Sequence, residues 1–232
     1  MRNRNKWIAL LGVLLIVGGV GFILYTLGKN LPNPFDIASA LGMDNNTLPV
    51  IAPSGSVGAP TVSLDASYAP ANTPNPQAVG LIPDRLIIPV INLDAPIIPV
   101  SFSTITIGSQ VYDQWLTPNQ FAAGWQASSA LLGLPGNTVL SGHHNEYGKV
   151  FKDLVKLKKG DIVSLYSIAR EFRYQVVAAM ILPELNQPLS VRLDNARWIE
   201  KSTDERITLI TCWPAYSNTH RVIVVAYPIV NP

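Results

Sequence analysis

The hydrophobic and polar positions of this 232-residue chain divide it into three stretches of different character. Residues 7–28 contain no charged side chain and consist mostly of Leu, Ile, Val and Gly. Residues 29–80 show no sustained helical or strand period. Residues 81–232 alternate short apolar runs with turn residues, the pattern of one folded domain with its own core. The sequence therefore predicts one folded domain, preceded by an uncharged apolar segment and by a segment without regular secondary structure.

Most apolar runs of the domain are short and rich in β-branched and aromatic residues, as strands are. Helical periodicity is scarce, although Val150, Leu154 and Leu157 have the spacing of a short amphipathic helix, with lysines around them. These features predict a mainly β fold, a barrel or a sandwich, with a few short helices. The predicted strands are 85–88, 138–141, 161–166, 172–180, 207–211 and 222–227.

The first apolar segment, 7–28, is long enough to cross a bilayer, because 22 residues at about 1.5 Å each match a hydrocarbon core of roughly 30 Å. Three basic residues lie within 1–6, which predicts a cytoplasmic N-terminus and an extracytoplasmic domain. A cleaved signal peptide is the alternative, but its apolar run is usually only about 7–15 residues long. We therefore expect a single-pass membrane protein anchored by 7–28.

The segment 29–80 has the composition of a tether. It contains eight prolines and only four charged residues, with Ser, Thr, Asn, Ala and Gly filling much of the rest. Segments of this kind cannot offset their ordering entropy by burial and stay extended or disordered. We expect a Pro-rich extracytoplasmic linker at 29–80.

The charge of the domain excludes one class of partner. Residues 81–232 contain 13 Lys plus Arg and 12 Asp plus Glu, so their net charge is near +1. This balance provides no excess of positive charge of the kind that binds nucleic acid.

The single cysteine, Cys212, is the candidate reactive group. An exported chain with one cysteine has no internal disulfide, so the thiol is inert packing, half of an intermolecular bridge, or a nucleophile. Arg221 follows nine residues later. If 207–211 and 222–227 are neighbouring antiparallel strands, Cys212 and Arg221 face each other. These residues alone leave a nucleophile and a buried, inert cysteine equally open.

Several motifs together resemble the sortase family. Residues 208–212 (TLITC), followed by Arg221, are similar to the family's cysteine motif and its downstream arginine. Residues 138–143 (TVLSGH) resemble its strand that ends in Gly-His. The motifs at 88–96 and 115–118, and the segment 147–161, resemble the start of the sortase domain and the stretch after its histidine. The resemblance covers most of 81–232, with its motifs in the family's order.

The resemblance implies a closed β-barrel of about eight strands and a membrane-bound cysteine transpeptidase. Sortases cleave a Leu-Pro-any-Thr-Gly signal of exported proteins between Thr and Gly and pass the acyl group to an amine on a peptidoglycan precursor or another protein. Carried over, Cys212 is the nucleophile, His143 the general acid and base, and Arg221 the donor to the substrate carbonyl and its oxyanion. These steps need no metal or organic cofactor, and the sequence shows no convincing acidic cluster for the calcium that some sortases bind.

The neighbours of these residues have less specific roles. His144 competes with His143 for the general acid and base, but adjacent side chains of a strand point to opposite faces. His220 is expected to point away from Arg221 for the same reason. Thr211 and Trp213 are candidate substrate contacts, although strand propensity alone accounts for Thr211.

Within the family, the compact domain resembles the housekeeping or the class D and class E sortases more than the pilus class. Three other functions stay open. An exported cysteine peptidase would release the acyl group to water. An L,D-transpeptidase is a further alternative, although its Ser-His-Gly-Cys type of motif is absent. A tethered adhesin or scaffold would keep Cys212 buried and resistant to alkylation.

Overall fold

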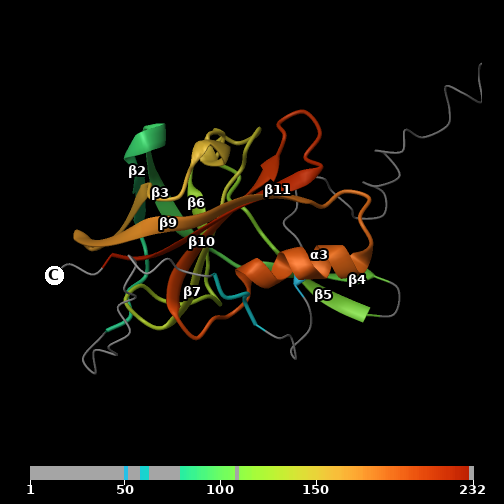
Figure 1. Ribbon diagram of the computed structural model, residues 1–232, viewed down its shortest axis with the longest axis horizontal. Helices are drawn as coiled ribbons and strands as arrows, with labels where there is room; N and C mark the ends of the chain where they lie inside the picture. The colour runs from blue at the N-terminus through green and yellow to red at the C-terminus, as the bar shows by residue number, and fades with distance from the viewer. Residues whose placement is uncertain (1–49, 52–57, 63–78, 108–109, 230–232) are drawn as a thin grey trace, which may run out of the picture. The chain divides into compact units, whose positions relative to one another are not determined.

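The computed structural model describes residues 50–51, 58–62, 79–107 and 110–229 of the chain (Figure 1). Eight of its strands form a closed barrel in the order β10-β11-β9-β8-β2-β3-β6-β7. Neighbouring strands are antiparallel except for two parallel pairs, β3 with β6 and β7 with β10, and the second of these closes the barrel. The barrel strands are β2 Arg85–Ile88, β3 Leu93–Val100, β6 Ala123–Gln126, β7 Gly136–Ser141, β8 Ile162–Ser167, β9 Arg170–Pro183, β10 Glu205–Trp213 and β11 His220–Pro228.

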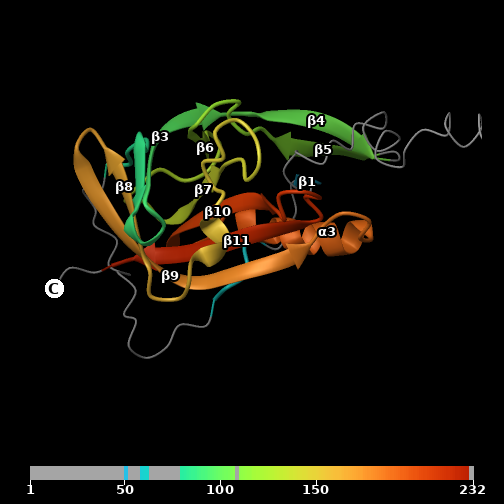
Figure 2. The same cartoon turned by 90° about the horizontal axis from the view of Figure 1, so that it is seen from above.

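The remaining elements lie outside the barrel wall or in its connections. A second sheet has the order β1-β5-β4. Figure 2 shows the β4–β5 hairpin and the helix α3 on either side of the end of the barrel where β10 ends and β11 begins. Among the described residues α3 is the one α-helix, which confirms the predicted mainly β fold. The strand order confirms the closed barrel. These elements are β1 Val50–Ile51, β4 Phe102–Ile107, β5 Gln110–Trp115, α3 Leu189–Ala196, and the 3-10 helices η1 Pro89–Ile91, η2 Leu154–Lys156 and η3 Arg197–Ile199.

The wall of the barrel separates two apolar clusters. Along β10, Ile207 and Leu209 belong to the interior cluster, whereas Ile210 belongs to a second cluster on the outer face. Trp115 and Ile199 pack in the outer cluster, which also covers the neighbouring strands β7 and β11. Because both faces are covered, β10 is buried on both sides from Arg206 to Cys212, including the polar residues Thr208 and Thr211.

The predicted strand 85–88 has the same bounds as β2, and the other five predicted strands are confirmed with shifted ends, but β1, β3, β4, β5 and β6 were not predicted. The strand β3 was missed because it contains two prolines, Pro96 and Pro99, and proline is rare in strands. Pro96 pairs with β2 just before the pairing with β6 begins at Ile97, and Pro99 pairs with β6 beyond the end of the pairing with β2. Each proline thus lies where β3 pairs with only one neighbouring strand. The absence of a backbone N–H is tolerated at such a position.

The helices also differ from the prediction. The apolar residues Val150, Leu154 and Leu157 are buried, but the chain there forms only the 3-10 helix η2. The helix α3 was not predicted; Leu189, Leu193 and Ala196 have helical spacing, but its buried residues are Asn195 and Ala196. Hydrogen bonds hold it instead: the Asn195 side chain donates to the carbonyl of Pro183 at 2.6 Å, and Arg192 donates to Glu184 at 2.8 Å.

Parts of the predicted linker contact the barrel domain. Val50 and Ile51 pair with Gln114 and Asp113 of β5 as the strand β1. The linker boundaries at 29 and 80 stay predictions. The predicted anchor, 7–28, lies outside the described residues, and the described part of the chain contains no helix that is long and apolar enough to cross a membrane.

A buried arginine fastens residues 58–62 to the barrel. Arg206 is 2% exposed, forms an ion pair with Asp204 and donates from Nη1 to the carbonyl of Pro60 at 2.7 Å. Ala59 donates its backbone N–H to the carbonyl of Lys201 at 2.9 Å. Burial opposes ionisation of Asp204, but hydrogen bonds from Tyr227 and Arg206 outweigh burial and lower the pKa of Asp204.

We predict that the substitution Arg206→Met lowers the free energy of unfolding by about 2–3 kcal/mol, because it removes charged hydrogen bonds from a buried site. Urea unfolding measures the change. The control is Arg85→Met, which breaks the ion pair with Asp94; both of these side chains are more than half exposed. That loss should be much smaller than the loss in Arg206→Met, because exposed ion pairs contribute little to stability. Equal losses in the two variants would contradict the role of Arg206.

Candidate active site

Cys212 and Arg221 are direct cross-strand partners at one end of the barrel. The register of the antiparallel pair β10–β11 places Cys212 opposite Arg221, as the sequence predicted. Both residues are nearly buried, at 7% and 4% exposed. On β10 and β11 they have the same parity as Ile210 and Ile223 of the outer cluster. The thiol and the guanidinium therefore belong to the outer face of the barrel wall, away from the interior core.

The parallel pairing of β7 with β10 brings His143 to the same end. In this register Ser141 is level with Ile210, so the residue two positions further on, His143, is level with Cys212. Two hydrogen bonds continue the alignment past the end of β7: Gly142 donates its N–H to the carbonyl of Ile210 at 3.2 Å, and Thr211 donates its hydroxyl to the carbonyl of Gly142 at 2.7 Å.

The side on which His143 lies follows from its neighbour Gly142. A Cβ atom at Gly142 would lie 2.5 Å from the ring of Phe151, a fully buried residue of the interior core. Position 142 thus points into the barrel, and in extended backbone position 143 points to the opposite side. His143 therefore shares the outer face with Cys212 and Arg221. The imidazole is 8% exposed.

Backbone carbonyls hold the guanidinium of Arg221. Its Nη1 donates to the carbonyl of Asn218 at 3.0 Å and to the carbonyl of His220 at 3.1 Å. Asn218 has a left-handed backbone, with φ 51°, and its N–H donates to the carbonyl of Pro214 at 2.9 Å. Asparagine tolerates this conformation better than most residues. The sequence did not single out Asn218. Its position in the loop between the two strands, three residues before Arg221, could have indicated a contact with that arginine.

His144 lies on the other side of the chain from His143. Its ring meets the half-buried ring of Trp213 edge to face, with centroids 4.9 Å apart, and Trp213 packs against the interior core. Its Nδ1 is 3.5 Å from the carbonyl oxygen of Phe151. Burial lowers the pKa of His144 and outweighs the opposing effect of that carbonyl. His220 pairs with Trp213 across the strands and has the parity of the interior residues Val222 and Val224.

The two candidate substrate contacts have different surroundings. Thr211 is fully buried, and its hydroxyl is engaged with the carbonyl of Gly142, so it ties the end of β7 to β10. Trp213 is half-buried next to Cys212 and contacts His144. The structure thus brings His143, Cys212 and Arg221 to one face. Thr211 links these strands beneath them.

The described residues contain no group of three or more His, Cys, Asp or Glu side chains that could hold a metal ion. The expectation that no cofactor is needed stays a prediction.

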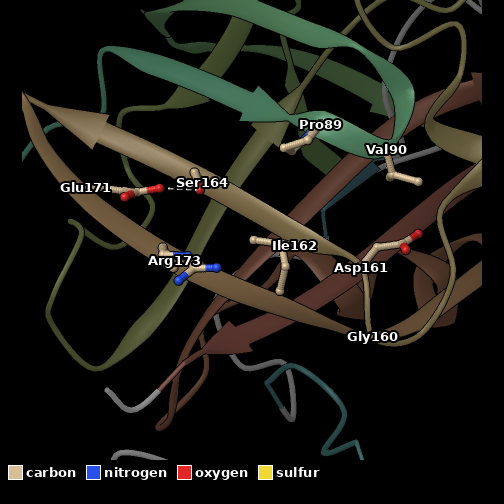
Figure 3. A pocket seen from close by; sticks show the side chains of 8 residues that line it. All are labelled: Pro89, Val90, Gly160, Asp161, Ile162, Ser164, Glu171 and Arg173. Atoms are coloured by element: carbon tan, nitrogen blue, oxygen red, sulfur yellow. Dashed lines mark hydrogen bonds between the residues drawn. The ribbon is translucent and has the colours of Figure 1, made fainter. Parts of the chain in front are cut away.

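A separate hollow lies on another part of the barrel (Figure 3). It is bounded by η1, β8 and β9, and β9 and β11 separate β8 from β10 in the barrel order. Its polar groups partly satisfy one another, since the hydroxyl of Ser164 donates to Glu171 at 2.7 Å. Cys212 does not line this hollow. Its lining residues are Pro89, Val90, Gly160, Asp161, Ile162, Ser164, Glu171 and Arg173.

Comparison with known proteins identifies the class to which this barrel and its cysteine belong. The family model described as the sortase domain matches residues 86–229. The chain therefore belongs to the sortase family.

Individual proteins are similar to parts of this chain. The chain is 27% identical over 160 residues to Sortase A of Bacillus anthracis, which covers 68% of this chain and 63% of that protein. It is 28% identical over 133 residues to Sortase A of Listeria monocytogenes, and this match covers 57% of this chain and 56% of that protein. The chain thus spans less than two thirds of the length of these curated relatives. Among solved structures, sortase C-1 of Actinomyces oris matches with a TM-score of 0.49 and 23% identity, over 64% of this chain and 73% of that one.

We predict that His144 makes folding stability depend on pH. Because the pKa of His144 is lowered in the folded state, the unfolded chain takes up the proton first as pH falls below the ordinary value of 6.5. The contribution to stability is complete above pH 6.5 and is lost as pH falls through the lowered pKa. Urea unfolding between pH 7.5 and pH 5 should show a smaller loss of stability in His144→Gln than in the wild type. Parallel curves for the two proteins would contradict the prediction.

Proposed function

We propose that this sortase is a membrane-anchored cysteine transpeptidase that cleaves a Leu-Pro-any-Thr-Gly type of signal between Thr and Gly and transfers the acyl group to an amine. The observation that carries the proposal is the register of β10 and β11, which places Cys212 opposite Arg221 with His143 at the end of the adjacent strand β7. A thiolate, a cation and an imidazole on one face are the groups that acyl transfer through a thioester requires.

The first half of the reaction forms the thioester. The Sγ atom of Cys212 attacks the carbonyl carbon of the threonine, and the carbonyl oxygen takes the negative charge. Arg221 donates hydrogen bonds to this oxygen, and its guanidinium is charged at any working pH. The carbonyls of Asn218 and His220 occupy Nη1, which fixes the guanidinium plane beside Cys212. When the C–N bond breaks, His143 gives its proton to the departing glycine amine.

The second half transfers the acyl group. An incoming amine attacks the thioester carbonyl, His143 accepts a proton from that amine, and the C–S bond breaks to return the thiolate of Cys212. Cys212 and His143 are both nearly buried, so the acceptor must reach the thioester through a narrow approach. Release to water, the activity of a cysteine peptidase, is the alternative outcome.

The cellular setting is part of the proposal. Residues 7–28 would anchor the chain in the cell membrane with the barrel outside, where exported proteins with a C-terminal sorting signal emerge. The acceptor amine would lie on a peptidoglycan precursor or on another surface protein. These partners rest on the predicted anchor and on membership of the family.

The proposal predicts the activities of four variants of the full chain. Fluorescent Leu-Pro-Ala-Thr-Gly and Leu-Ala-Ala-Thr-Gly peptides, with and without triglycine, separate cleavage from amine exchange. Cys212→Ala should abolish both, and Arg221→Lys should lower kcat/KM by about 10²–10³-fold because it loses the planar fork of donors. His143→Gln should lower kcat by about 10²–10⁴-fold.

The matched control is His144→Gln, which removes the adjacent imidazole from the interior side and should keep activity within about tenfold of the wild type. Loss of activity in His144→Gln with retention in His143→Gln would reverse the assignment of the general acid. Cleavage that persists in Cys212→Ala would contradict the thioester mechanism. Cleavage without exchange at any triglycine concentration would favour the peptidase.

A further inference from the structure

The loop after His143 has an unusual backbone that the proposed reaction steps leave unexplained. Tyr147, Gly148 and Lys149 have consecutive positive φ angles of 46°, 87° and 57°. A residue with a side chain costs about 1–3 kcal/mol in such a conformation, and two of these three residues carry one. Strained backbone of this kind persists only where its surroundings over-determine it, and it often occurs at functional sites.

Three contacts fix this loop to its surroundings. The side chain of Asn145 donates to the carbonyl of Ala215 at 2.7 Å, which ties the loop to the connection between β10 and β11. A Cβ atom at Gly148 would lie 2.7 Å from the Cβ atom of Phe121, so the backbone approaches Phe121 more closely than any other residue type allows. Phe151 donates its N–H to the carbonyl of His143 at 3.0 Å and closes the loop.

The result of this conformation is that the ring of Tyr147 covers His143. The two ring centroids are 4.8 Å apart, with an interplanar angle of 50°. Tyr147 is 48% exposed, whereas His143 beneath it is only 8% exposed. The loop therefore holds a large aromatic ring at the surface, in contact with the imidazole, where it limits both the movement of the imidazole and its contact with water.

We propose that Tyr147 is a positioning residue for His143. Its ring restricts the imidazole to the orientation needed for proton transfer to and from the amines at Cys212, and it limits access of water to the thioester beside that imidazole. This inference rests on the proposed function, because it assigns Tyr147 a role in that reaction. The strained backbone at 147–149 is the cost of aiming the ring at the imidazole.

The test compares Tyr147→Ala and Tyr147→Phe in the full chain with the same peptides and triglycine. Loss of the ring should lower kcat by about 10–100-fold with little change in KM, since misplacement of a reacting group by about 1 Å has effects of this size. The ratio of hydrolysed to exchanged product should rise in Tyr147→Ala. Tyr147→Phe keeps the ring and should stay within about twofold of the wild type in kcat and in product ratio.

The matched control is Tyr166→Ala, which removes a half-buried tyrosine ring on β8, separated from β10 by β9 and β11. Both kcat and the product ratio should stay within about twofold of the wild type. If Tyr147→Ala proves unstable by thermal unfolding, Tyr147→Leu takes its place. An unchanged kcat and product ratio without the ring would overturn the proposal. An effect of Tyr147→Phe equal to that of Tyr147→Ala would overturn it as well, because the hydroxyl would then be the active group.

A spectroscopic comparison separates this inference from the proposed function. The chain has three histidines, so isotope labelling of histidine gives three sets of ring signals, and His143→Gln identifies the set from His143. Those signals should move in Tyr147→Ala and stay in place in Tyr147→Phe. A wild-type chain that cleaves no peptide would contradict the proposed function, and the positioning role would then fail with it even if the signals move. Signals that do not move would contradict the ring contact alone.

Discussion

The parallel pairing of β7 with β10 is the constraint on which the candidate site depends. It closes the barrel and makes two strands from distant parts of the chain end at the same level. In an antiparallel arrangement the end of β7 would lie at the start of β10, and His143 would be separated from Cys212 by the length of the strand. The hairpin of β10 and β11 then adds Arg221 directly opposite Cys212. Three chemical groups therefore meet through backbone register alone.

Burial of both faces of β10 gives this register its rigidity. The interior cluster holds Leu209 and Val222, and the outer cluster holds Ile210 and Ile223, so a shift by one residue would exchange two apolar faces and misplace every side chain along both strands. Cys212 and Arg221 continue the outer apolar face as its last, polar positions. Their low exposure follows from that position, and low exposure strengthens the electrostatic interactions that the proposed reaction needs.

The sequence predicted the parts of the site that depend on strand periodicity and chain order. Cys212 and Arg221 were expected to face each other because two apolar strands flank a short connection, and the register confirms this. The resemblance of residues 138–143 to the family's Gly-His motif favoured His143 over His144, and alternation predicted that the two side chains lie on opposite sides, as the position of Gly142 against Phe151 indicates. The sequence could not show the loop that carries Tyr147, because its left-handed conformation depends on contacts with Ala215 and Phe121, far away in the chain. The contact of Pro60 with Arg206 was missed for a similar reason, because it is a hydrogen bond between residues far apart in the chain. The helix α3 was also missed, and the side-chain hydrogen bonds that tie it to Pro183 and Glu184 have no signature in the sequence.

If Cys212 is the nucleophile that Arg221 and His143 serve, an acyl-enzyme must form on its Sγ atom during cleavage. The full chain is incubated with an excess of Leu-Pro-Ala-Thr-Gly peptide without added amine, quenched in acid, and analysed by intact mass and by peptide mapping. We expect an adduct with the mass of the acyl fragment that ends in threonine, located on Cys212 and released by hydroxylamine. Cleavage of the peptide with the adduct on any other residue, or cleavage with no hydroxylamine-sensitive adduct at any time, would show that Cys212 is not the nucleophile.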